Sequence, residues 1–126
     1  MKIKGKEYQF KYTVRARLEI AKALPEGSIS EISKVLGGKN DAKAIELIQT
    51  MALAMNRAFL KKQADEDGKQ YDEADLIDPD WILDMEITEE QQLEDELLAA
   101  FLEGNKTLIE TEAPAGKKTK NQKKPT

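Results

Sequence analysis

The first twelve residues alternate between polar and apolar side chains with a period of two. Ile3 precedes a Lys4-Gly5 pair, and the aromatic residues Tyr8, Phe10 and Tyr12 then share one side of an extended segment. This pattern predicts a short hairpin with one aromatic face. We expect that face to pack against a helix, because a lone two-stranded hairpin is only marginally stable. Stacking on nucleic-acid bases, helped by the interspersed lysines, is the less favoured interpretation.

Apolar residues then recur every three to four positions, which is the spacing of an amphipathic helix. Thr13 is a suitable N-cap for a helix that runs to about Leu24. The apolar stripe predicted for this helix consists of Val14, Leu18 and Ala21.

A short second helix is predicted to follow. Ser28 and Glu31 have the spacing of a capping box, and Gly37-Gly38 is expected to end the helix through the conformational freedom of glycine. Its apolar side consists of Ile29, Ile32 and Leu36.

The principal helix is predicted to begin at Asn40 or Asp41 and to span about 22 residues. Its apolar positions are Ile45, Ile48, Ala52, Met55 and Phe59, widened by Leu47 and Met51. The stripe also matches a coiled-coil seam, but it covers barely three heptads and lacks sustained charge pairing beside the seam. Packing within the protein is therefore favoured.

Residues 64–75 are expected to form a solvated loop, because like charges surround Gly68 without periodicity. The acidic run superficially resembles a calcium-binding loop. Aligned on Gly68, however, Gln63 occupies the first ligand position and Ala74 stands where a bidentate glutamate belongs. We therefore expect no specific calcium site here.

Two further helices are predicted in the last half of the chain. Asp78-Pro79 begins a short one that carries Trp81, Ile82 and Met85 on one side. Thr88 and Gln91 form a second capping box for the other, and Gly104-Asn105 is expected to end it. The apolar face of this last helix consists of Leu93, Leu97 and Phe101, broadened by Leu98, Ala100 and Leu102.

The end of the chain changes in composition. Residues 107–109 are compatible with a last strand, whereas residues 110–126 contain Pro, Gly, Thr and Lys without large apolar side chains. Such a segment buries too little to offset its ordering entropy. The sequence therefore predicts a mainly α domain with an N-terminal β-hairpin over residues 1–109, followed by a disordered Lys-rich tail over residues 110–126.

Composition removes most catalytic chemistry. The 126 residues include no cysteine and no histidine, so thiol catalysis, serine triads and the usual zinc or haem ligands are missing. Pairs of carboxylates, which could act as general acid and base, do occur in the acidic residues 65–96. That segment is so rich in carboxylates that some pairs are inevitable, so they do not indicate a catalytic site. We therefore expect a protein that is not an enzyme and has no cofactor. No apolar run reaches the roughly 18–20 residues of a membrane span, so no membrane association is expected.

Charge is segregated along the chain. Residues 1–64 carry a net charge of +7, residues 65–96 carry −14, and residues 97–126 carry +3. This distribution presents faces of opposite sign to partners, which favours a binding function.

Both ends of the chain resemble one protein family. The opening Lys-Gly-Lys-Glu-Tyr-x-Phe at residues 4–10, the run at residues 13–20, and the Leu-rich run at residues 97–106 with its Lys-rich ending are similar to tail assembly chaperones. These are proteins of long-tailed phages and prophages of Gram-positive bacteria. The resemblance implies a small, mostly helical, non-enzymatic protein of the host cytoplasm that is absent from the finished virion. It also implies two partners, the tape measure protein, which such chaperones keep soluble, and the tail tube protein, which they help to recruit.

The physical pattern is compatible with that role, because a chaperone for a long amphipathic client needs apolar surface together with charge that keeps the complex soluble. We expect Trp81, Met85 and Phe101 to contact the partner, although each is also a candidate for the core. Two other functions stay open. One is a nucleic-acid-associated regulator that uses the Lys-rich tail, although specific nucleic-acid binding is not expected. The other is a generic dimeric adaptor.

Overall fold

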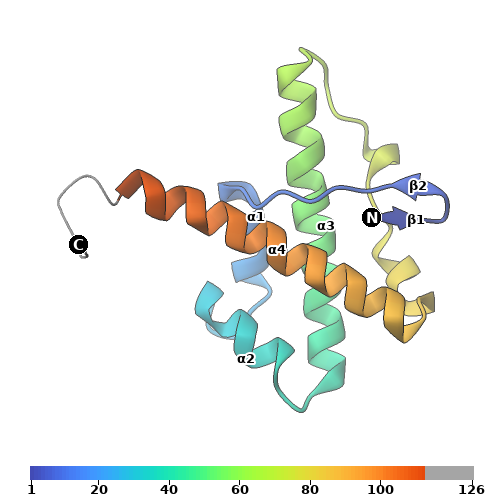
Figure 1. Cartoon of the computed structure of the whole chain (residues 1–126), viewed down its shortest axis with the longest axis vertical. Coiled ribbons are helices and arrows are strands. Elements are labelled where there is room, and N and C mark those ends of the chain that lie inside the picture. Colours follow the sequence, from blue (N-terminus) through green and yellow to red (C-terminus); the bar gives the residue numbers. More distant parts are fainter. Residues whose placement is uncertain (113–126) are drawn as a thin grey trace.

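One long helix, α3, organises the fold. The computed structural model describes the backbone of residues 1–112 and the side chains of residues 1–105. Within that part, α1, α2, the 3₁₀ turn η3 and α4 all pack against α3, and α4 crosses it (Figure 1). The elements in chain order are β1 (Lys2–Ile3), β2 (Lys6–Glu7), α1 (Val14–Lys22), η1 (Ile29–Glu31), α2 (Ile32–Leu36), α3 (Asp41–Glu66), η2 (Glu73–Asp75), η3 (Pro79–Asp84) and α4 (Ile87–Glu112). The mainly α architecture with an N-terminal hairpin is confirmed.

The hairpin is antiparallel and very short. Its strands pair Lys2 with Glu7 and Ile3 with Lys6, and both turn residues, Lys4 and Gly5, have positive φ angles of 53° and 81°. Two positive φ angles are the signature of the type I′ turn, whose twist matches that of a two-residue hairpin. Glycine is favoured at the second position because it adopts this conformation without steric cost.

The hairpin continues into an extended segment, residues 8–12, that crosses α3. The buried Asn56 of α3 holds this segment, because its Nδ2 donates to the carbonyl of Gln9 at 2.9 Å. Its Oδ1 accepts from the backbone N–H of Ile77 at 2.8 Å. The backbone N–H of Lys11 also donates to the carbonyl of Met55 at 3.0 Å. One buried amide therefore connects three parts of the chain with both of its polar atoms satisfied. The aromatic segment packs on helices, as the sequence predicted.

The apolar face predicted for α1 is wrong. Val14 and Leu18 are exposed, whereas Ala16 and Ile20 are buried completely against the core. Thr13 is the N-cap, as predicted, and accepts from the N–H of Ala16 at 3.3 Å. Ala16, Ile20 and the buried Leu24 form a second stripe at spacings of four residues that satisfies helical periodicity equally well. The small Ala16 side chain suits the close contact between α1 and α3.

The capping box of the second helix is confirmed, with Ser28 and Glu31 in the expected roles. The helix ends at Leu36 with Gly37 as its C-cap, as predicted, but Gly37 has an ordinary right-handed conformation with φ of −90°. The next residue, Gly38, lies where the backbone leaves no room for a side chain. A Cβ atom at Gly38 would lie 2.8 Å from the carbonyl oxygen of Lys34.

The principal helix begins as predicted and ends later. Asn40 is its N-cap and accepts from the N–H of Lys43 at 3.1 Å. The helix spans 26 residues to Glu66, so the predicted start of the loop at residue 64 is three residues early. Gly68, with φ of 69°, and Lys69 then return their N–H groups to the carbonyls of Asp65 and Ala64 at 3.2 and 2.8 Å. This pattern is a Schellman motif, in which the glycine adopts the left-handed conformation.

Both predicted ends of the last helix are wrong. Thr88 is inside α4, and the cap is Glu86, whose N–H donates to the carboxylate of Glu89 at 3.0 Å. The helix also continues through Gly104 to Glu112, so the predicted strand at 107–109 and the first three residues of the predicted tail are helical. Gly104 provides room for Tyr12, since a Cβ atom there would lie 2.8 Å from its ring. The rest of the predicted disordered tail, residues 113–126, lies outside the described residues.

Candidate partner-binding surfaces

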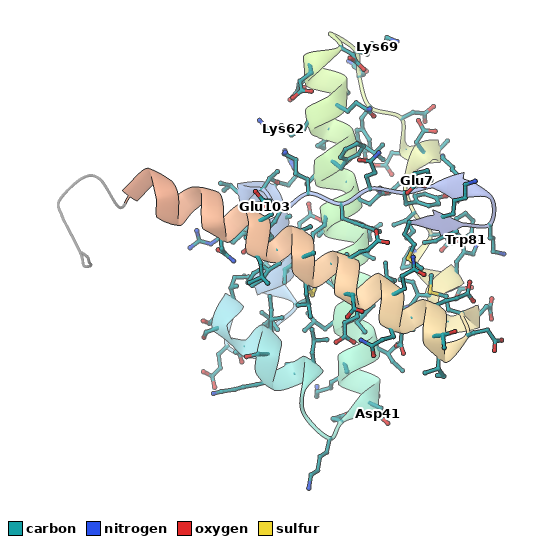
Figure 2. The ribbon with its side chains drawn as sticks, viewed as in Figure 1. Glu7, Asp41, Lys62, Lys69, Trp81 and Glu103 are labelled. Atoms are coloured by element: carbon teal, nitrogen blue, oxygen red, sulfur yellow. The ribbon has the colours of Figure 1, made fainter. Side chains whose placement is uncertain are left out.

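Trp81 and Met85 lie at the edge of the core, on η3 and at its C-cap. Both are partly buried against the core cluster. The Trp81 ring meets Tyr8 edge to face, with ring centroids 6.2 Å apart, and the ammonium of Lys4 lies 5.3 Å from its centroid. Figure 2 shows Trp81 beside the hairpin. These contacts make Trp81 a structural link between η3 and the hairpin, with part of its surface still accessible.

Phe101 occupies a different place. It packs edge to face on Tyr12, with ring centroids 4.9 Å apart, and burial raises the pKa of the Tyr12 hydroxyl. Phe101 lies 14 residues beyond Ile87 on α4, which corresponds to about 21 Å along the helix. The three residues predicted to bind the partner therefore do not form one surface, and Phe101 mainly secures the extended segment to α4.

The most exposed large apolar side chains of the acidic residues 65–96 belong to Leu83, between Trp81 and Met85, and to Ile87, two residues after Met85. Leu83 is 57% exposed and Ile87 is 79% exposed, although both are large apolar residues. On the inner side of the same turn, Ile82 is buried, and Gln49 of α3 donates to the carbonyl of Pro79 at 2.9 Å. These anchors hold η3 against α3, and Leu83 is left on the outer side.

Sequence reasoning did not select this pair. The only available signal was the spacing of four residues between Leu83 and Ile87, which spans the junction between η3 and α4. Periodicity within a single predicted helix does not detect a pair that belongs to two elements.

A second exposed apolar pair lies on α1. Val14 is 81% exposed and Leu18 is 55% exposed, again four residues apart. The two pairs differ in the charges around them. The α1 pair is accompanied by basic residues, namely Arg15, Arg17 and Lys22. The segment that carries Leu83 and Ile87 is acidic instead.

Residues 70–105 contain thirteen aspartates and glutamates and neither lysine nor arginine. The crowding affects Glu94 of α4, whose pKa is raised by burial first and by the neighbouring charges of Glu90 and Asp95 second. Two of the described cations compensate locally, because Lys6 of the hairpin forms an ion pair with Asp75 at 3.2 Å and the N-terminal ammonium forms one with Glu96 at 3.3 Å. Leu83 and Ile87 therefore form an apolar spot within a negative surface, which we call the acidic apolar face.

No protein-family model, curated protein or solved structure matches this chain.

The acidic apolar face has the chemistry of a binding surface. Among the described residues, no group of three or more acidic side chains is arranged to hold a metal ion, and no helix is long and apolar enough to cross a membrane. What this face offers is apolar contact area surrounded by negative charge. A partner that places apolar side chains on Leu83 and Ile87 and basic groups around them would bury the exposed area and meet complementary charge.

Proposed function

We propose that this protein is a tail assembly chaperone of a long-tailed phage or prophage. In this role it binds the tape measure protein through the acidic apolar face, keeps it soluble and helps to recruit tail tube protein around it. The observation that carries the proposal is the exposure of Leu83 and Ile87 within a segment of 36 residues that has no basic side chain. The resemblance at both ends of the chain supplies the family.

Energetic considerations give the apolar side chains and the carboxylates of this face different roles. Full burial of a Leu or Ile side chain stabilises a complex by roughly 1.5–3 kcal/mol, whereas an exposed ion pair contributes about 0–1 kcal/mol. Apolar contact would therefore provide most of the affinity. The surrounding carboxylates would select basic clients, speed the encounter and keep the complex soluble.

The timing and place of action belong to the same proposal. A chaperone of this kind acts in the host cytoplasm before the tail is complete and is absent from the finished virion. Gene order offers an independent check, because its gene should lie between the gene for a tube protein and the gene for a very long helical protein.

Coexpression with the neighbouring tape measure protein tests the proposal. The wild-type chain should keep that protein in the soluble fraction, and the double variant Leu83→Gln/Ile87→Gln should lose this effect. Because both side chains are exposed, the variant should melt within a few degrees of the wild type. The matched control is Val14→Gln/Leu18→Gln, which removes an equally exposed pair from basic surroundings and should still solubilise the partner.

Two further variants separate this mechanism from its rivals. Deletion of residues 117–126, which carry five lysines, should leave solubilisation unchanged. Trp81→Ala and Phe101→Ala should lower the melting temperature, since both rings pack on neighbouring aromatic residues. If the tail deletion abolishes solubilisation while Leu83→Gln/Ile87→Gln does not, the apolar mechanism is wrong.

A further inference from the structure

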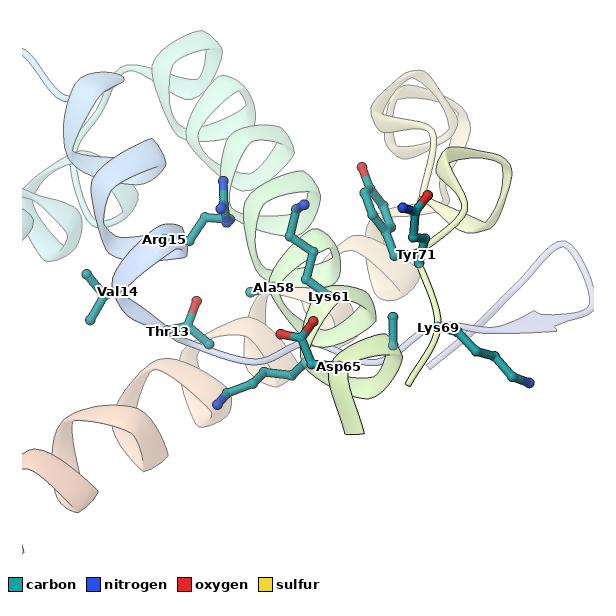
Figure 3. Close-up of a pocket in the computed structure, with 11 residues that line it drawn as sticks. Thr13, Val14, Arg15, Ala58, Lys61, Asp65, Lys69 and Tyr71 are labelled. Atoms are coloured by element: carbon teal, nitrogen blue, oxygen red, sulfur yellow. The ribbon is translucent and has the colours of Figure 1, made fainter. Parts of the chain in front are cut away.

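A groove of about 800 Å³ lies on another part of the molecule, at the C-terminal half of α3. One wall is the start of α1 with Arg15, and the other is the chain after α3 with Lys69 and Tyr71. Lys61 and Asp65 of α3 lie between the walls (Figure 3), and Lys62 of the same helix also lines the groove. Its lining therefore holds four cations and one carboxylate.

Within the described residues, no carboxylate lies at salt-bridge distance from the basic side chains of the groove, which are Arg15, Lys61, Lys62 and Lys69. Lys61 instead lies over the ring of Tyr71, 4.7 Å from its centroid, and the hydroxyl of Tyr71 donates to Glu73. Glu73, two residues after Tyr71, thus already has a hydrogen-bond donor.

The ends of the groove side chains point in different directions. In Figure 3, the guanidinium of Arg15, the ammonium of Lys61 and the hydroxyl of Tyr71 reach the same edge of the groove, whereas Lys69 and Val14 point away from it. Arg15 and Lys61 come from different helices, so two cations line one groove from two sides, and Lys61 also contacts the Tyr71 ring. Ala64 contributes apolar surface to the groove, whereas Ala58 is only 2% exposed.

We infer that this groove binds an acidic segment of a partner protein, in which glutamates or aspartates alternate with small aliphatic side chains. Carboxylates of such a segment would pair with Arg15 and Lys61, and its aliphatic side chains would contact Ala64. The site is separate from the acidic apolar face and has the opposite charge. It therefore holds or fails independently of the proposed chaperone function.

Other occupants fit less well. The Lys-rich residues 117–126 of the chain itself have the same sign as the groove. A nucleic acid would need a longer track of phosphate contacts than the four basic side chains of the groove provide. A peptide carboxylate needs only the two cations at the opening.

Fluorescence anisotropy with a labelled peptide of alternating Glu and Val tests the inference on the full chain. The wild type should bind this peptide and not the matched peptide of alternating Lys and Val. Arg15→Gln/Lys61→Gln should weaken binding by about tenfold or more, with the loss growing as salt is lowered. The control Lys34→Gln/Lys39→Gln removes the same charge from exposed positions near the other end of α3. It should change the affinity less than about twofold.

Four outcomes would overturn the inference. They are absence of peptide binding, equal loss in the groove and control variants, tighter binding of a single-stranded oligonucleotide of equal charge, and salt-sensitive self-association abolished by Arg15→Gln/Lys61→Gln. The last result would assign the groove to the acidic stretch of a second copy of the chain. Thermal melts of both double variants identify any loss caused by unfolding.

Discussion

Gly104 of α4 lies against Tyr12 in the segment before α1. Its missing Cβ atom would sit 2.8 Å from the Tyr12 ring and 3.0 Å from the Tyr12 carbonyl oxygen. The sequence predicted a helix end there, because glycine with asparagine is a common stop signal. The glycine serves instead as a contact point, and Asn105 donates its side-chain amide to the carbonyl of Phe101 at 3.1 Å within the continuing helix.

Gly104→Ala is therefore expected to destabilise the protein. Alanine favours a helix interior by up to about 1 kcal/mol relative to glycine, but overpacking against Tyr12 should cost about 1–3 kcal/mol. Urea unfolding measures the balance. In a Tyr12→Ala background the contact with the ring is gone, but the contacts with the Cβ atom and the carbonyl oxygen of residue 12, at 2.9 and 3.0 Å, remain. The same substitution should therefore still destabilise the protein there, by less than in the wild type. A stabilising effect of Gly104→Ala in the wild-type background would contradict the packing role of Gly104.

Glu94 provides a pH-dependent prediction. Its pKa is raised in the folded protein above the usual 4.5, so the wild type loses stability as the pH rises through this range and Glu94 ionises. Glu94→Gln removes that loss and the repulsion from Glu90 four residues away, which is worth about 0.2–0.5 kcal/mol. The variant should be more stable at neutral pH, and the gain should vanish below the unfolded-state pKa.

Chemical unfolding at several pH values measures this difference. Glu46→Gln on α3 is the matched control, because the residues three and four positions away from Glu46 include no acid. It should show no stabilisation at neutral pH. A gain for Glu94→Gln that persists unchanged in acid would exclude ionisation of Glu94 as the cause.

The helices differ in how well the sequence specified them. Caps at Thr13, Ser28 and Asn40 were predicted correctly, because a cap depends on residues within one turn. The buried side of α1 was predicted wrongly, because two apolar stripes fit the helical periodicity and only contact with α3 selects between them. The exposure of Leu83 and Ile87 also depends on how η3 is anchored to α3, and local pattern does not contain that information. The sequence also placed Trp81 and Met85 on the correct short turn, because such a turn, like a cap, depends on residues that are close together in the chain.

Cap substitutions test the helix boundaries. Asn40→Ala should cost about 1 kcal/mol, because it removes the acceptor for the N–H of Lys43 at the start of α3. Thr88→Ala should cost much less, since Thr88 lies inside α4 and makes no side-chain hydrogen bond in the described part of the chain. Thermal unfolding measures both. A larger loss for Thr88→Ala than for Asn40→Ala would contradict the assigned start of α4.

At the scale of the whole molecule, charge and apolar exposure are arranged together. The acidic apolar face combines Leu83 and Ile87 with a stretch, residues 70–105, that contains no lysine or arginine, whereas the groove at the C-terminal half of α3 is lined by four basic side chains and one carboxylate. The segregation seen along the sequence thus becomes two distinct surfaces after folding. Each matches a different class of protein segment, one basic and amphipathic, the other acidic.

Hydrogen exchange on the complex with the tape measure protein tests the central claim most directly. Glu89 and Glu90 donate their N–H groups to the carbonyl of Glu86, so the N–H groups of Ile87 and Thr88 are the ones at the start of α4 that should exchange rapidly in the free protein. Binding at the acidic apolar face should slow exchange over residues 83–90 in the wild type, while the complex formed by Val14→Gln/Leu18→Gln should show the same protection. Unchanged exchange at residues 83–90 in a stable complex would contradict the account.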